Sequence, residues 1–242
     1  MKNMNRIISV RNPKSPIAEA YRGIRTSIEF SNLDKELKVI NVTSSTQNEG
    51  KSTVISNLAV SFANLDKKVL ILEGDLRNPS VHRMFNISNV EGLTDILLGN
   101  KSFTECVHCT DVRNLHVLTC GPIPPNPSEM LSSKKIKDFV ESLRDYYDYV
   151  FIDAPPIGIV TDAGIISSYT DSCIFVVGAG EADIEMAKIS KERLEKVGAN
   201  ILGVVLNKFE ASGANGYYNY YYEQETRRTR KSLKKRKIEW GM

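Results

Sequence analysis

The chain has 242 residues, of which 41% are hydrophobic, and a formal net charge of +3 from 32 basic and 29 acidic side chains. Eight of the basic residues lie between Arg227 and Lys237, a stretch that contains no acidic residue. The other positions carry 24 basic and 29 acidic side chains, a net charge of −5, so the body of the chain is slightly acidic. This length and composition allow a large α/β domain with an ample core and exclude wholesale disorder.

No stretch approaches the roughly 18 uninterrupted apolar residues that a membrane span needs, and residues 1–10 lack the apolar core of a signal peptide. Four cysteines are too few for a disulfide scaffold of this size and fit a reducing compartment. We therefore expect the body of the protein to be cytosolic.

The first predicted element is an amphipathic helix over Ser15–Asn32. Its apolar residues recur at helical spacing and form one stripe: Ile17, Tyr21, Ile24 and Ile28. Charged side chains project from its flank: Glu19, Arg22 and Arg25. Pairing of these charges within one solvated helix face would contribute only about 0.2–0.5 kcal/mol.

Six short apolar runs rich in β-branched residues follow: Val39–Thr43, Val69–Leu72, Leu115–Leu118, Tyr149–Ile152, Cys173–Val177 and Ile201–Leu206. Three intervening segments are long enough to be crossover helices: Lys51–Asn64, Ser133–Asp145 and Ile184–Val197. Runs that are apolar throughout are typical of strands buried on both faces. The pattern predicts an α/β fold with a doubly wound, mostly parallel sheet and flanking helices.

A phosphate-loop motif, G-x-x-x-x-G-K-[ST], lies between the first strand and the following helix, with Ser45 in place of the first glycine. It comprises Ser45, Thr46, Gln47, Asn48, Glu49, Gly50, Lys51, Ser52 and Thr53. Backbone N–H groups of such a loop cradle the phosphates of a nucleotide. Lys51 is expected to reach the β/γ oxygens and the Ser52 hydroxyl to take one Mg²⁺ position. An ordinary Ser/Gly-rich turn would not require this sequence.

Two further predicted strands end in carboxylates, Glu73 with Asp75 on one and Asp153 on the other. The carboxyl ends of parallel strands form the ligand crevice of an open α/β sheet, so these acids should meet the phosphate loop. We expect Asp75 and Asp153 to hold Mg²⁺ directly or through water. Glu73 is expected to accept the proton of an attacking hydroxyl. A lone strand-end Asp is more often a turn or capping residue, but the adjoining loop favours the functional interpretation.

These motifs together resemble the bacterial tyrosine autokinases (BY-kinases) of capsule and exopolysaccharide assembly, in the form whose kinase is a separate cytoplasmic chain. The resemblance covers nearly the whole sequence. Four segments resemble the family's oligomerisation motif E-x-x-R-x-x-R, its Walker A motif, its second acidic strand motif and its Walker B motif, in this order: Glu19–Arg25, Ser45–Thr53, Leu70–Arg77 and Val150–Pro156. The segment Gly121–Glu129 and the clustered C-terminal tyrosines also resemble the family.

The resemblance implies a P-loop NTPase fold like that of the partitioning ATPases. Residues 1–37 would carry the oligomerisation helix, 38–210 the kinase domain and 211–242 a flexible tail. It implies an ATP- and Mg²⁺-dependent autokinase that phosphorylates its tail between the subunits of a ring and regulates polysaccharide polymerisation and export. The expected partners are a membrane-spanning activator (a polysaccharide co-polymerase) at the inner face of the membrane and a phosphotyrosine phosphatase. In relatives the residue matching Asn207 reads the adenine base; a turn residue is the alternative.

Two sequence features bear on this resemblance. The family usually has Asp where this chain has Glu73, whose side chain is longer by about one C–C bond. The related chromosome-partitioning and septum-positioning ATPases carry a signature lysine at the position of Thr46, and its absence favours the kinase. A nucleotide-switched positioning ATPase remains the alternative function.

Five of the ten tyrosines fall within six positions: Tyr217, Tyr218, Tyr220, Tyr221 and Tyr222. We expect them to be phosphate acceptors, because an ATP site is predicted in the same chain. The alternatives are a sticky edge segment or stacking on nucleic acid, although no nucleic-acid partner is expected. Five phosphotyrosines would add a charge of roughly −8 to −10 near the eight basic residues of Arg227–Lys237. We expect phosphorylation to release this basic run from an anionic surface.

Two further groups of residues are ambiguous. Four Cys and His residues between positions 106 and 116, together with Cys120, could be written as a zinc cluster, but His116 lies in an apolar strand pattern and the cysteines are expected to be small buried fillers. Asp162 is either a helix cap or a residue that supports the site.

Overall fold

The computed structural model describes residues 7–32 and 36–209. The chain divides into two units, Met1–Lys208 and Phe209–Met242, and all the described helices and strands belong to the first. The tyrosine cluster and the basic run lie outside the described residues, and the expected boundary at residue 210 stays a prediction.

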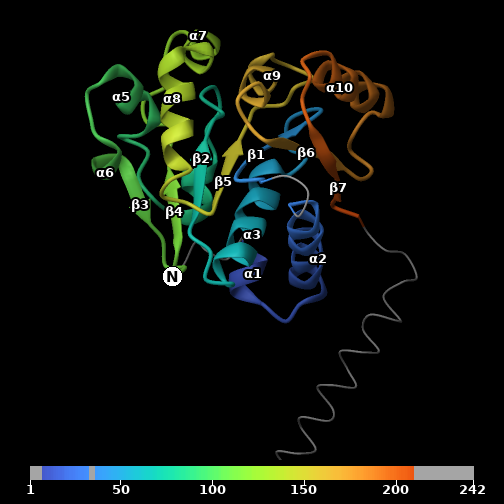
Figure 1. The fold of residues 1–242 in the computed structure, drawn as a ribbon. Helices are drawn as coiled ribbons and strands as arrows, with labels where there is room; N and C mark the ends of the chain where they lie inside the picture. The colour runs from blue at the N-terminus through green and yellow to red at the C-terminus, as the bar shows by residue number, and fades with distance from the viewer. Residues whose placement is uncertain (1–6, 33–35, 210–242) are drawn as a thin grey trace, which may run out of the picture. The chain divides into compact units, whose positions relative to one another are not determined.

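The described strands form one seven-stranded sheet with the order β3-β4-β2-β5-β1-β6-β7 (Figure 1). Their bounds are β1 Val39–Ser44, β2 Val69–Glu73, β3 Val107–Cys109, β4 Leu115–Leu118, β5 Tyr149–Asp153, β6 Ser172–Gly178 and β7 Ile201–Asn207. All neighbouring strands are parallel except β3 and β4. The expected mostly parallel sheet is confirmed, and the antiparallel edge strand β3 was not predicted, because a three-residue run gives no periodic signal.

Four of the helices match the predicted ones, α2 Pro16–Ser31, α3 Lys51–Ala63, α8 Lys134–Leu143 and α10 Ile184–Lys196. The others are short: α1 Ile8–Arg11, α4 Val81–Phe85, α5 Leu93–Leu98, α6 Phe103–Cys106, α7 Pro127–Ser132 and α9 Asp162–Ser167. None of the helices within residues 7–32 and 36–209 has the length and apolarity needed to cross a membrane.

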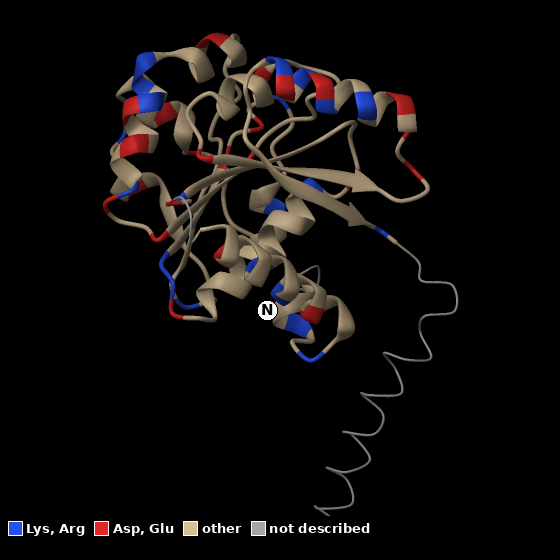
Figure 2. Ribbon diagram, turned by 45° about the vertical axis from the view of Figure 1, so that its right-hand side comes forward, with Lys and Arg blue, Asp and Glu red and all other residues tan. Residues whose placement is uncertain are grey.

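Helices cover both faces of the sheet, because successive side chains of each buried strand point to opposite sides. In β2, Val69 and Ile71 pack with α1–α4, whereas Leu70 and Leu72 pack with α5–α10. Figure 2 shows this two-sided arrangement, with charged residues on the helices and loops and the strands almost free of them. The doubly wound architecture therefore follows from strands that are apolar on both faces.

Helix α2 departs from its predicted apolar stripe at one end. Ser15 caps the helix by accepting a hydrogen bond from the Ala18 N–H group (3.1 Å). Tyr21 and Ile28 are buried, but Ile17 is 58% exposed. The stripe contacts the core only after the first turn, so the prediction was wrong for Ile17.

The start of β1 is held by a partly buried ionic cluster around Asp171, which precedes β6. Its carboxylate accepts hydrogen bonds from the N–H groups of Lys38 (2.8 Å) and Val39 (2.7 Å). It also accepts two hydrogen bonds of 2.8 Å from the Arg144 guanidinium. Burial acts to raise the pKa of Asp171, but these hydrogen bonds outweigh burial and hold the pKa below its ordinary value.

We expect Asp171→Asn to lower the free energy of unfolding by about 1–3 kcal/mol at pH 7, because it weakens charge-assisted hydrogen bonds at a partly buried site. Since the folded pKa lies below the unfolded one, this stabilisation is present above the unfolded pKa of about 3.9 and is lost as the pH falls through the folded pKa. Urea unfolding of both proteins at pH 7 and near pH 3 should show the difference shrinking. The exposed Asp138→Asn is the control, and a loss that does not change with pH would contradict the assignment.

Candidate functional site

The phosphate loop joins the carboxyl end of β1 to the start of α3 and takes left-handed backbone conformations at two positions. Asn48 has φ 65° and Gly50, the N-cap of α3, has φ 93°. The left-handed backbone at Gly50 favours glycine, and a Cβ atom there would lie 2.1 Å from Nδ2 of Asn207, so any side chain would also have to displace that amide.

Glu49 stabilises the loop from within. Its carboxylate accepts hydrogen bonds from the Ser45 N–H group (3.0 Å), the Ser45 hydroxyl and the Thr46 hydroxyl (3.1 Å), and the side chain is buried. Ser45 itself has no positive φ, so the loop does not need glycine at its first position. The predicted contact of Glu49 with ATP stays a prediction; in this structure its carboxylate binds the loop.

The end of β7 supports the same loop from the other side. Asn207 Nδ2 donates to the Glu49 carbonyl oxygen (2.9 Å), and Lys208 Nζ donates to the Asn48 carbonyl oxygen (2.7 Å). Lys208 also pairs with Glu181 at 2.5 Å. The amide of Asn207 is thus engaged by the loop backbone, and its contact with adenine stays a prediction.

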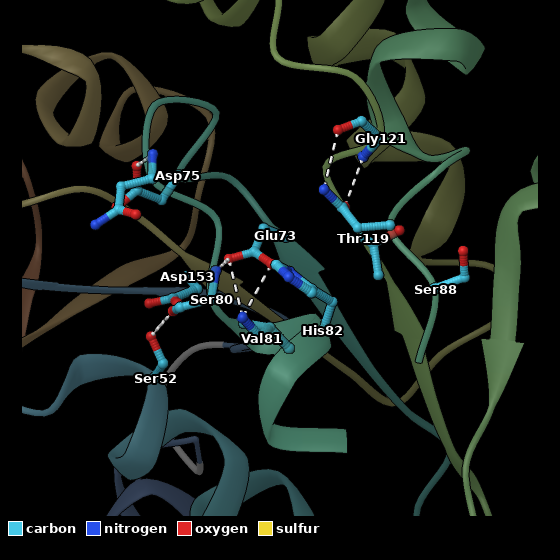
Figure 3. Close-up of polar contacts among 12 residues, drawn as sticks. Ser52, Glu73, Asp75, Ser80, Val81, His82, Ser88, Thr119, Gly121 and Asp153 are labelled. Carbon is cyan, nitrogen blue, oxygen red and sulfur yellow. Dashed lines mark hydrogen bonds and ion pairs between the residues drawn. The ribbon is translucent and has the colours of Figure 1, made fainter. Parts of the chain in front are cut away.

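Ser52 and Asp153 form the centre of the expected magnesium site (Figure 3). The Ser52 hydroxyl donates to Asp153 Oδ2 (2.6 Å). The second oxygen, Oδ1, is buried and has no hydrogen-bond partner among the described residues. Oxygen donors of this kind are what Mg²⁺ prefers, so the residues present fit the ion. Burial raises the pKa of Asp153, while the positive charge of Lys51 opposes the rise.

Asp75 lies at the same edge of the sheet, in the loop after β2. Its Oδ1 atom accepts hydrogen bonds from the N–H groups of Asn78 (3.0 Å) and Arg77 (3.2 Å). Burial raises the pKa of Asp75 above its ordinary value, although these hydrogen bonds and Lys51 lower it. Asp75 lines the cavity described below and remains available to a cation there.

Glu73 does not line the cavity described below, but it contacts Ser80, which does. Its side chain is 0% exposed and accepts hydrogen bonds from the N–H groups of Ser80 (2.8 Å) and Val81 (3.0 Å) at the start of α4. Oε2 is 3.7 Å from Nδ1 of His82. Figure 3 shows the carboxylate pointing toward these residues. The Ser80 hydroxyl in turn lies 2.6 Å from that of Ser52, so Glu73 is linked to the magnesium site through Ser80.

A cavity of about 490 Å³ opens above these residues. It is lined by the phosphate loop, by residues of the β2–α4 segment, by residues 155–156 and 159–160 after β5, and by Lys208. Its lining includes four cations, Lys51, Arg77, Arg83 and Lys208, but one carboxylate, Asp75. The cavity is therefore suited to an anionic ligand of nucleotide size.

Several residues of this site carried no clear sequence signal. Ser80 and Arg83 lie on or beside the short helix α4, which the sequence did not predict. Arg77 stood inside a recognised segment but had no assigned role. Lys208 follows Asn207, and only the folded chain brings it to the loop.

The predicted oligomerisation residues pair within their own chain. Arg22 binds Glu19 (Nε to Oε2, 2.7 Å) and the Pro13 carbonyl oxygen (2.8 Å), and Arg25 donates to the Ser61 carbonyl oxygen of α3 (2.8 Å). Glu19 and Arg22 remain partly exposed, and their role between subunits stays a prediction.

The cysteine and histidine residues that could have formed a zinc cluster differ in their burial and contacts. Cys106 and Cys120 are buried as expected, whereas Cys109 is exposed, so the expectation of a buried filler was wrong for that residue. It lies on β3, the edge strand of the described sheet, whose only neighbour among the described strands is β4. His116 Nδ1 is 2.8 Å from the Tyr147 hydroxyl, a hydrogen bond that occupies this ring nitrogen.

Comparisons with known proteins agree with this geometry. A family model described as "ParA: NUBPL iron-transfer P-loop NTPase" matches residues 36–238. The chain is 40% identical over 211 residues to the putative tyrosine-protein kinase CapB of Staphylococcus aureus. The aligned residues cover 87% of this chain and 92% of that protein. The chain is 42% identical over 214 residues to the tyrosine-protein kinase YwqD of Bacillus subtilis, covering 88% and 90%.

Solved structures give the same result. The chimerical protein CapA2B2 superposes with a TM-score of 0.82 at 41% identity, covering 84% of this chain and 90% of that one. The septum site-determining protein MinD of Pyrococcus horikoshii, complexed with Mg-ADP, superposes with a TM-score of 0.62 at 25% identity, covering 73% and 72%. The chain therefore belongs to the ParA-type P-loop NTPases and, within them, to the bacterial tyrosine-protein kinases.

Proposed function

We propose that the chain is an ATP- and Mg²⁺-dependent autokinase that phosphorylates its tyrosine cluster between subunits and so regulates polymerisation and export of a surface polysaccharide. The observation that carries this proposal is the cation-lined cavity that Ser52 lines, together with Asp153 beside it, which binds the Ser52 hydroxyl and has one buried carboxylate oxygen with no hydrogen-bond partner among the described residues. The five clustered tyrosines of the same chain supply acceptors.

In this proposal the loop N–H groups and Lys51 bind the phosphates of ATP. Ser52, Asp75 and Asp153 would hold Mg²⁺, which supplies positive charge against the β- and γ-phosphate oxygens. The bond between the γ-phosphorus and the β,γ-bridging oxygen breaks, a bond to the tyrosine oxygen forms and ADP is released. The phenolic proton passes to Glu73 if that residue is the general base, and otherwise to water. Positioning the two reactants contributes most of the catalysis.

The surroundings of Glu73 favour an anchoring role over proton transfer. Its carboxylate is fully buried and its oxygens accept backbone hydrogen bonds from the start of α4. Asp75 lines the cavity instead. The general-base role of Glu73 therefore stays a prediction that kinetics can decide.

The proposed partners follow from the family. We infer a membrane-spanning activator whose cytoplasmic end completes the kinase and brings it to the inner face of the membrane. A ring of identical subunits would use the exposed Glu19 and Arg22 of α2. A phosphotyrosine phosphatase would reverse the modification.

Incubation with Mg-ATP and the activator's cytoplasmic fragment should place phosphate on residues 217–222, detected by mass spectrometry. Lys51→Met should abolish the modification, because it removes the positive charge expected at the β/γ oxygens. Transfer between subunits is tested by mixing full-length Lys51→Met protein with an active chain truncated after Glu210, and phosphorylation of the former is the expected result. ATP hydrolysis with no modified tyrosine would instead support a positioning ATPase.

We expect Glu73→Gln to lower kcat less than about tenfold, because the amide oxygen can still accept the Ser80 and Val81 N–H groups. A general base would contribute about 10²- to 10⁴-fold. Steady-state kinetics over pH 6–9 distinguishes the two roles, with Glu73→Ala as the variant that removes the anchor. A loss of more than about 100-fold for Glu73→Gln at unchanged KM would identify Glu73 as the general base.

A further inference from the structure

Three segments far apart in the sequence converge on one guanidinium group beside the cavity. Arg77 Nε donates to Asp162 Oδ2 (2.7 Å), and its Nη2 donates to Asp162 Oδ1 (3.2 Å) and to the Ser128 hydroxyl oxygen (2.8 Å). The Ser128 hydroxyl also donates to Asp162 Oδ1 (2.6 Å). Asp162 begins α9, and Ser128 lies in the first turn of α7.

Asp162 is much more deeply buried than Arg77, its ion-pair partner. Asp162 is 0% exposed, whereas the Arg77 side chain is 41% exposed and lines the cavity with Lys51 and Ser52. A buried carboxylate without a partner would be strongly destabilising, so Asp162 requires the guanidinium. The two parallel hydrogen bonds fix the plane of the guanidinium as well as its position.

The hydrogen-bond donors of Arg77 can be counted. Arginine has five N–H groups, and three are used by Asp162 and Ser128. The two on Nη1 donate no hydrogen bond to the described residues. One edge of the group is therefore held by the protein, while donors remain for a ligand in the cavity.

We propose that Asp162, with Ser128, is a positioning residue that orients Arg77 so that its remaining N–H groups bind the γ-phosphoryl group of ATP. This inference rests on the proposed function. As the bond to the β,γ-bridging oxygen breaks and the bond to the tyrosine oxygen forms, negative charge is spread over the γ-phosphoryl oxygens. A guanidinium held in advance stabilises that charge without having to reorganise.

A second pair in the same chain provides a matched control. Arg144 also donates two hydrogen bonds to one carboxylate, that of Asp171, but through Nη1 and Nη2 (both 2.8 Å), and neither residue lines the cavity. If the ion pair of Arg77 and Asp162 only holds chain segments together, Asp162→Asn and Asp171→Asn should lower the stability of the fold and leave nucleotide binding unchanged. If the proposal holds, Asp162→Asn should also change ligand discrimination.

The first experiment measures binding of Mg-ADP and of a non-hydrolysable Mg-ATP analogue by isothermal titration calorimetry. Arg77→Ala and Asp162→Asn should weaken binding of the analogue about 10- to 100-fold, as expected for loss of a charge-assisted contact or of its support, and change ADP binding less than about threefold. Asp171→Asn should leave the ratio of the two affinities unchanged. Equal losses for both nucleotides, or none, would overturn the proposal.

The second experiment is a double-mutant cycle on kcat/KM for tyrosine phosphorylation. Because Asp162 acts through Arg77, the double variant should be no worse than Arg77→Ala within about twofold. Additive losses would contradict the proposal. If Asp162→Asn does not fold, Ser128→Ala replaces it in both experiments, with a smaller loss expected and an unchanged analogue-to-ADP ratio as the contradicting result.

The proposed function and the role of Arg77 can be disproved independently of each other. A wild-type protein that never phosphorylates tyrosine in the presence of the activator fragment would remove the proposed function, while the nucleotide discrimination could still be measured. An active wild-type enzyme whose discrimination survives Arg77→Ala would remove the role of Arg77 alone.

Discussion

Two buried carboxylates lie in register on neighbouring strands, and much of the site can be understood as the accommodation of their charges. Glu73 of β2 is paired with Asp153 of β5, and the charge of Glu73 contributes to the raised pKa of Asp153. Glu73 is satisfied by the N–H groups at the start of α4. Asp153 has the Ser52 hydroxyl, the nearby charge of Lys51 and one oxygen left for a cation. The start of α4 thus stabilises Glu73, whereas residues at the end of the phosphate loop stabilise Asp153.

The strands and the phosphate loop could be predicted because their signals are local. Apolar β-branched runs such as Val39–Thr43 specify buried strands, and Gly-Lys-Ser-Thr at a strand-to-helix turn specifies a phosphate site. The direction of a side chain has no such signal. Glu73 and Asp75 are two residues apart, yet one faces α4 and the other lines the cavity. Sequence patterns that treat both as site carboxylates cannot distinguish them.

Contacts between distant segments were the other part that the sequence could not supply. Sequence alone does not decide between a capping and a supporting role for Asp162, because its partners, Arg77 and Ser128, come from distant segments. The hydrogen bond from the Asn207 amide to the phosphate loop had no sequence signal either, because it depends on the neighbouring positions of β1, β6 and β7. Ile17 fits the helical period, but periodicity does not show where the core ends along a helix.

The contact between Gly50 and Asn207 links two positions that lie at opposite ends of the domain's sequence. The amide of Asn207 occupies the space that any side chain at position 50 would need, and the same amide holds the loop carbonyl next to that glycine. A side chain at position 50 would have to displace the Asn207 amide, and the Glu49 carbonyl oxygen would then lose this hydrogen-bond donor. The end of β7 and the phosphate loop are therefore coupled, because a substitution at position 50 or at position 207 would disturb the same hydrogen bond.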